Sequence, residues 1–130
     1  MKSNATFETL TVYQASKKLC LAVYPFPFKL PLSKDYALID QIRRSAGSVM
    51  DNIAEGYERG GNKELIQFLF IAKGSAGELR SQIIRAKELG YLTHEDAANL
   101  YESSLTVSKM LSGYIKYLKQ SDFKGSKYTP

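Results

Sequence analysis

The fold is decided around the stretch Pro25-Phe26-Pro27-Phe28-Lys29-Leu30-Pro31, which separates two long amphipathic parts of the chain. Each proline lacks a backbone donor and restricts the residue before it, so this stretch cannot be helical. Two more breaks follow, at Gly60-Gly61-Asn62 and at Gly90. Glycine readily adopts the left-handed conformation that ends a helix. The three breaks therefore divide the chain into four segments.

Within each segment apolar residues recur at spacings of three and four, which is typical of a helix with one buried face. We expect helices over residues 10–24, 33–59, 63–89 and 96–120. Short connections make consecutive helices run antiparallel. The sequence thus predicts an all-α fold, an antiparallel up-down four-helix bundle over residues 1–120, followed by a flexible polar C-terminal tail over residues 121–130.

Residue types that cap helices stand near the expected starts. Ser33 and Asn62 are predicted as N-caps of the second and third helices. Thr93, with an acid three residues later, resembles a capping box before the fourth. The only histidine, His94, is predicted to be exposed beside that cap.

Composition indicates one globular domain with an excess of positive charge. The 130 residues include 18 Lys and Arg against 13 Asp and Glu, a net charge of +5, which favours polyanionic partners. The single cysteine, Cys20, excludes an intrachain disulfide and is predicted to be buried. With no signal-peptide core and no uninterrupted apolar run of about 20 residues, we expect a cytoplasmic protein without a membrane partner.

The inventory of reactive side chains is small. Metal sites in helical bundles use paired Glu-x-x-His motifs, which one histidine cannot supply. Gly60-Gly61 lacks the lysine and hydroxyl of a phosphate-binding loop. We therefore expect no enzyme activity, no cofactor and no metal.

The second expected helix carries polar residues at helical spacing on a face away from its apolar stripe: Gln41, Arg44, Ser48, Asn52, Glu55 and Arg59. One interpretation is a hydrogen-bonded layer between helices, with Arg44 and Glu55 satisfied by partners such as Glu78 or Lys73. The other is a ligand or catalytic site. We favour the structural layer because polar residues at helix contacts usually serve specificity.

The third expected helix is apolar on two faces. Ile66, Phe70 and Ile84 lie away from its main stripe, with Gly74 and Gly77 between them. Glycine inside a helix costs about 1 kcal/mol relative to alanine, which suggests a close approach by another helix. These five residues predict self-association.

Basic residues occur in local sets that are candidate nucleic-acid contacts: Lys17, Lys18, Arg43, Arg44, Lys73, Arg80 and Lys87. Three of them recur every seven residues along the third helix. No zinc-finger, RNP or helix-turn-helix signature accompanies them, so binding would be electrostatic and tolerant of sequence. The alternative is that these long side chains bind no partner and only keep the surface of the bundle hydrated.

Two blocks of sequence resemble a known family. The run QIRRSAGSVMDNIAEG at residues 41–56 and the run FLFIAKGSAGEL at residues 68–79 are similar to the 23S rRNA intervening-sequence proteins. The resemblance covers about residues 7–118. It implies family-signature positions at Asn52, Glu55, Gly56, Ser75 and Glu78, which join Arg44 and Ser48 in the expected polar layer.

The resemblance also implies a four-helix bundle that assembles as a homopentamer. Some members are encoded inside insertions in bacterial large-subunit rRNA genes, and a related branch associates with a reverse transcriptase and binds nucleic acid. We therefore expect a non-enzymatic, homo-oligomeric basic protein that binds RNA, DNA or a reverse-transcriptase-like partner with little sequence specificity. The alternative is a protein-interaction scaffold without direct nucleic-acid binding.

Overall fold

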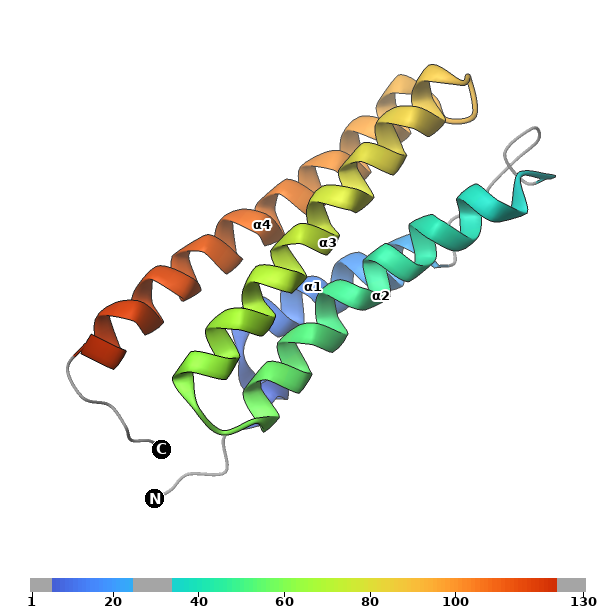
Figure 1. The fold of residues 1–130 in the computed structure, drawn as a ribbon. Helices are drawn as coiled ribbons and strands as arrows, with labels where there is room; N and C mark the ends of the chain where they lie inside the picture. The colour runs from blue at the N-terminus through green and yellow to red at the C-terminus, as the bar shows by residue number, and fades with distance from the viewer. Residues whose placement is uncertain (1–5, 25–33, 124–130) are drawn as a thin grey trace.

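The structure, a computed structural model, describes residues 6–24 and 34–123, and over these ranges four α-helices pack as an up-down bundle (Figure 1). The helices are α1 (Thr11–Val23), α2 (Tyr36–Glu58), α3 (Asn62–Glu88) and α4 (His94–Phe123), and a short 3-10 turn, η1 (Phe7–Thr9), precedes α1. In the described part, α3 packs on both α2 and α4, and the shorter α1 lies against α2 and α4. The predicted all-α bundle is confirmed.

The core follows the apolar stripes that the sequence predicts. Branched and long aliphatic side chains with less than 2% exposure come from all four helices: Val23, Ile42, Val49, Ile53, Leu69, Leu79, Ile83 and Leu111. Burying one such side chain stabilises the fold by about 1.5–3 kcal/mol. Small residues lie between them, including Ala46, Ala72 and Ala76, each fully buried. The bundle is therefore held chiefly by this shared interior, because most of the stability of helices in proteins comes from packing of an apolar face.

Two of the predicted N-caps are wrong. α2 is capped by Asp35, whose carboxylate accepts a hydrogen bond from the Leu38 amide at 3.1 Å. Ser33, the predicted cap, lies outside the described residues. α3 follows an extended Gly61, so Asn62 is its first helical residue rather than its cap. A carboxylate suits the positive end of a helix, which explains why Asp35 caps α2.

The other helix ends lie close to the glycine breaks and the threonine cap that the sequence predicts. Gly60 and Gly90 have positive φ angles of 87° and 79°, the conformation in which glycine ends a helix. The Thr93 hydroxyl accepts a hydrogen bond from the Asp96 amide at 3.0 Å, and His94 follows it, exposed. α4 reaches Phe123, three residues beyond its predicted end, and residues 124–130 of the predicted tail lie outside the described residues.

Two sequence-based expectations concern burial and membranes. Cys20 is a buried free thiol on α1, and burial, followed by the negative charge of Asp51, raises its pKa.

Across residues 6–24 and 34–123, none of the helices has the length and hydropathy that crossing a bilayer requires.

Candidate functional site

A polar contact joins the middle of α2 to the middle of α3. The Oγ atoms of Ser48 and Ser75 lie 2.8 Å apart. Asn52 Nδ2 donates to the Ser48 carbonyl at 2.8 Å and to its hydroxyl at 2.9 Å. The structure thus brings together three residues of the expected polar layer, and their hydrogen bonds link two helices.

Other members of that layer lie elsewhere, and their expected partners are wrong. Arg44 pairs with Asp40 at 2.7 Å, and Arg59 pairs with Glu55 at 2.8 Å, both along the exposed side of α2. Residues four apart on one helix meet more easily than residues on different helices. Glu78 and Lys73, the partners expected on α3, are exposed.

Gly56 belongs to the expected layer by position but serves packing. A Cβ atom at this position would lie 2.6 Å from the Phe68 Cβ and 3.2 Å from Leu65 Cδ1. Real Cβ atoms essentially never approach that closely. Glycine therefore allows the last turn of α2 to contact the first turns of α3.

Arg80 links α3 to α4 through hydrogen bonds from one nitrogen of its guanidinium. Its Nη1 donates to the Ser104 carbonyl and hydroxyl, each at 3.2 Å, and to the Ser108 hydroxyl at 2.6 Å. The fully buried Ser104 hydroxyl in turn donates to the Ala76 carbonyl at 2.9 Å. Hydrogen bonds to a charged group are among the stronger ones in proteins, so this network helps to fix α4 on α3.

The other predicted nucleic-acid contacts divide into two groups. Arg43 is half-buried and donates to the Tyr24 carbonyl at 3.0 Å, so it holds the end of α1 against α2. Lys17, Lys18 and Lys73 are exposed, whereas Lys87 is half-buried, with its Nζ 3.8 Å from a Glu88 carboxylate oxygen. Among these lysines, Lys17, Lys18 and Lys73 are therefore the most exposed.

The predicted self-association residues lie mainly on one side of α3, beside α4. Phe70 and Ile84 are 46% and 45% exposed. A Cβ atom at Gly74 would meet nothing within 4 Å, so no neighbour in the described chain requires this glycine. Ile66 departs from the expectation, because it is half-buried and packs on the core.

We call this surface the outer α3–α4 face. It consists of Phe70, Lys73, Gly74, Gly77, Arg80, Ile84 and Lys87 on α3, and of Tyr101, Lys116 and Lys119 on α4. Lys119 Nζ lies 5.2 Å from the centroid of the Phe70 ring, and the Arg80 guanidinium lies 6.0 Å from that of Tyr101. Cations at such distances are attracted to the ring face. The face therefore combines positive charge with aromatic rings.

A cavity of about 480 Å³ lies at one end of this face, between the last turns of α3 and the first turns of α4. Half of its lining residues are aliphatic, and its polar lining includes Lys87, Tyr101 and Glu102. Sequence reasoning missed Tyr101 as a candidate residue and did not connect Lys119 with Phe70. Their pairing with α3 residues becomes visible only when the sides of two helices are matched across the bundle.

Comparison with known proteins places the chain in a family. A profile of the 23S rRNA-intervening sequence proteins matches residues 8–113, most of the chain. The chain belongs to the 23S rRNA-intervening sequence protein family. The sequence resemblance is thereby confirmed.

A solved structure shows the same fold. It is a protein of unknown function from the S23 ribosomal protein family of Bacteroides thetaiotaomicron, 24% identical, with a TM-score of 0.76. The match covers 82% of this chain and 99% of the other. No curated protein matches the chain significantly.

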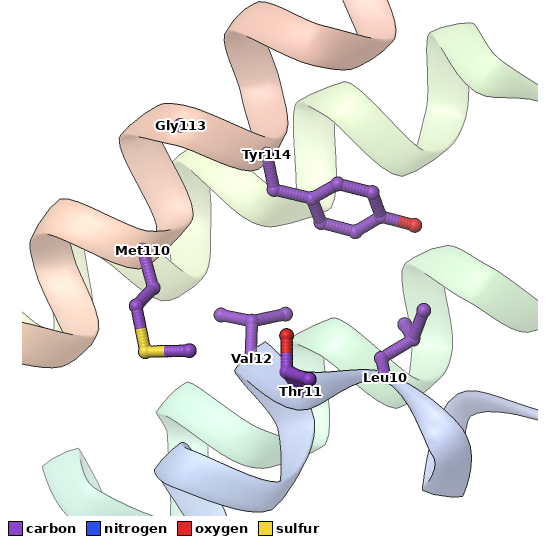
Figure 2. A pocket seen from close by; sticks show the side chains of 6 residues that line it. All are labelled: Leu10, Thr11, Val12, Met110, Gly113 and Tyr114. Carbon is purple, nitrogen blue, oxygen red and sulfur yellow. The ribbon is translucent and has the colours of Figure 1, made fainter.

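This 23S rRNA-intervening sequence family member has a second notable cavity, of about 320 Å³, between the start of α1 and the C-terminal half of α4 (Figure 2). Leu10, Val12 and Met110 give it an apolar lining, and the Tyr114 ring extends along one side. Burial, followed by the neighbouring Tyr57 and Tyr117, raises the pKa of Tyr114 to about 12. Near neutral pH its hydroxyl is therefore protonated and unsuited to act as a general base.

The raised pKa of Tyr114 predicts a loss of stability in alkali. The unfolded chain releases this proton near pH 10, whereas the folded chain retains it until about pH 12. The contribution is complete below pH 10 and is lost as the pH rises from 10 to 12. Two pKa units correspond to at most about 2.7 kcal/mol, and partial exposure reduces the expected loss to about 1 kcal/mol.

The measurement is urea unfolding of the wild type and of Tyr114→Phe at several pH values between 9 and about 12. The wild type should lose about 1 kcal/mol more than the variant over this interval. Tyr36→Phe, which alters a side chain that is 77% exposed, is the matched control and should follow the wild type. If the unfolding free energies of the wild type and Tyr114→Phe changed equally with pH, the alkaline loss of stability would not come from Tyr114.

Proposed function

We propose that this protein binds the backbone of RNA or DNA along the outer α3–α4 face, with little sequence preference. The observation that carries the proposal is the interleaving of cations and rings, Lys119 on Phe70 and Arg80 on Tyr101. Proteins that bind single strands without sequence preference combine a basic track with aromatic platforms for the bases.

The distribution of charge supports this choice of surface. Between residues 103 and 121, α4 carries Lys109, Lys116 and Lys119 and no acidic residue. On α3, Lys73 lies one heptad before Arg80 and is exposed. Neutralising phosphates with such side chains releases counterions. The logarithm of the binding constant should therefore fall linearly with the logarithm of the salt concentration.

The test is fluorescence anisotropy of a labelled mixed-sequence single-stranded RNA, titrated at several salt concentrations. Lys73→Gln and Lys119→Gln should each weaken binding and reduce the salt slope by about 0.7, the value for one phosphate contact on a single strand. The double variant Lys17→Gln/Lys18→Gln changes exposed lysines on α1 and should have a smaller effect. Loss of binding only in the α1 variant would show that this face is the wrong one.

A second candidate function, self-association, rests on the exposed apolar side chains of the same face. Phe70 and Ile84 flank Gly74, over which no described residue packs, an arrangement that would admit a helix of a second copy. This agrees with the homopentamer that the family resemblance implies. It would make the protein an interaction scaffold, and the covered face could not hold nucleic acid at the same time.

Ile84→Lys distinguishes the two candidates. It adds a positive charge to a side chain that is 45% exposed, so nucleic-acid binding should strengthen and its salt slope should increase. Self-association through this face should instead weaken, because a lysine would have to be desolvated in the contact. Light scattering and RNA anisotropy on the same samples measure both properties.

A further inference from the structure

The Arg80 guanidinium is only partly used by the contacts within the chain. Its Nη1 donates three hydrogen bonds to described residues, two to the acceptors of Ser104 and one to Ser108. Its Nε and Nη2 donate to no described residue, and neither is among the buried polar atoms that lack a partner. These two nitrogens therefore reach solvent.

Arg80 also has no carboxylate partner among the described residues. No acidic oxygen of the described residues lies within 4.0 Å of its side chain, whereas Arg44 and Arg59 each pair with an acid on their own helix. Tethering of Nη1 holds the guanidinium in one orientation. An arginine held in this way presents two parallel donors, the geometry that matches a carboxylate or a phosphate.

Gly77 keeps this edge of the guanidinium accessible. A Cβ atom at Gly77 would lie 3.7 Å from Arg80 Nη2, its nearest neighbour, so a longer side chain there would cover the nitrogen. Gly74, one turn earlier, has open space above it. Glycine within a helix lowers its stability relative to alanine, and here the two glycines leave the space beside the unused donors open.

We propose that the Nε and Nη2 edge of Arg80 is an oxyanion site that binds a phosphate group of the nucleic-acid backbone, with Gly77 as its opening. The inference rests on the proposed function and names the group that the face recognises. Phosphate is favoured over a carboxylate of a second copy because Lys73 and Lys87 continue the same column, each seven residues or about 10 Å along the helix axis. A polyanion can satisfy several cations in such a column at once.

The test uses the Nε–H resonance of Arg80 in an NMR spectrum of the 15N-labelled protein, assigned by its absence in Arg80→Lys. Inorganic phosphate, and separately a short single-stranded RNA, should shift this resonance while that of Arg59, paired with Glu55, stays unchanged. If neither probe moves the Arg80 resonance at about 50 mM salt, where phosphate contacts are strong, the proposal is wrong.

Gly77→Glu tests the site while retaining Arg80 and its bonds to α4. The new carboxylate, three residues before Arg80, can pair with Nη2 and compete with the anion. It should lower the affinity for RNA about tenfold. Gly77→Gln, neutral and of the same size, covers the nitrogen without pairing with it and should lower the affinity less. RNA affinity that is unchanged in both variants would overturn the site.

Two further outcomes separate this inference from the proposed function. A phosphate shift at Arg80 without any RNA binding supports the oxyanion site and contradicts nucleic-acid binding. RNA binding that is unchanged in Gly77→Glu supports the function and overturns the site. A shift that depends on protein concentration but not on phosphate identifies a carboxylate of a second copy, which also overturns the proposal.

Discussion

Gly56→Ala is expected to lower the free energy of unfolding by about 3 kcal/mol, the upper part of the usual range for overpacking. The added methyl group would lie 2.6 Å from the Phe68 Cβ and 3.4 Å from the Leu65 Cα. Both atoms are fixed to the backbone of α3, so no side-chain rotation can remove the clash. α2 and α3 would have to separate, and buried contacts around Leu65 would be lost.

Urea denaturation, monitored by circular dichroism, measures this change. The urea concentration at the midpoint should fall, whereas the dependence of the unfolding free energy on urea should stay the same. Gly74→Ala is the matched control, because a Cβ atom there meets nothing within 4 Å. It should raise stability by up to about 1 kcal/mol through helix propensity alone. A Gly56→Ala variant as stable as the wild type would mean that α2 and α3 do not approach closely at this point.

Arg80→Glu is expected to lower the free energy of unfolding by a similar amount, about 3 kcal/mol. The substitution removes all three Nη1 bonds to α4. It also brings a carboxylate toward the Ser104 carbonyl oxygen and hydroxyl in a half-buried position, where like partial charges repel. The fully buried Ser104 would lose one partner while keeping its bond to Ala76.

Arg44→Glu is the control for the charge change. Arg44 forms an exposed pair with Asp40 along α2, and reversal there should cost no more than about 1 kcal/mol. Denaturation of both variants at neutral pH gives the comparison. Equal stability of Arg80→Glu and Arg44→Glu would show that the α4 contacts of Arg80 contribute little. Because Arg80→Glu affects folding, it is a poor probe of nucleic-acid binding, for which Gly77→Glu is suited.

Much of the candidate surface could be predicted from α3 alone. The seven-residue spacing of Lys73, Arg80 and Lys87 and the glycines at 74 and 77 are visible in the sequence, and they lie on the outer α3–α4 face. The residues that each of these side chains contacts could not be predicted. Arg80 meets acceptors 24 and 28 residues away, and Lys119 meets Phe70 across the bundle.

The sequence by itself determined the number of helices, the buried side of each and most of their ends. Those properties depend on spacings of three and four residues and on local breaks at proline and glycine, which act within one segment of chain. The identity of the N-cap residues did not follow from the sequence, because neighbouring polar residues compete for the same backbone amides, as Asp35 shows for α2.

Only the tertiary structure decided which polar residues serve the bundle and which remain free for a partner. Ser48 and Ser75 meet between helices, whereas Glu55 pairs along its own helix, although all three belong to the same expected layer. Gly56 is a contact point rather than a polar position. The physical reason is that hydrogen bonds and close contacts between helices depend on the relative positions of side chains far apart in the chain, which local periodicity does not specify.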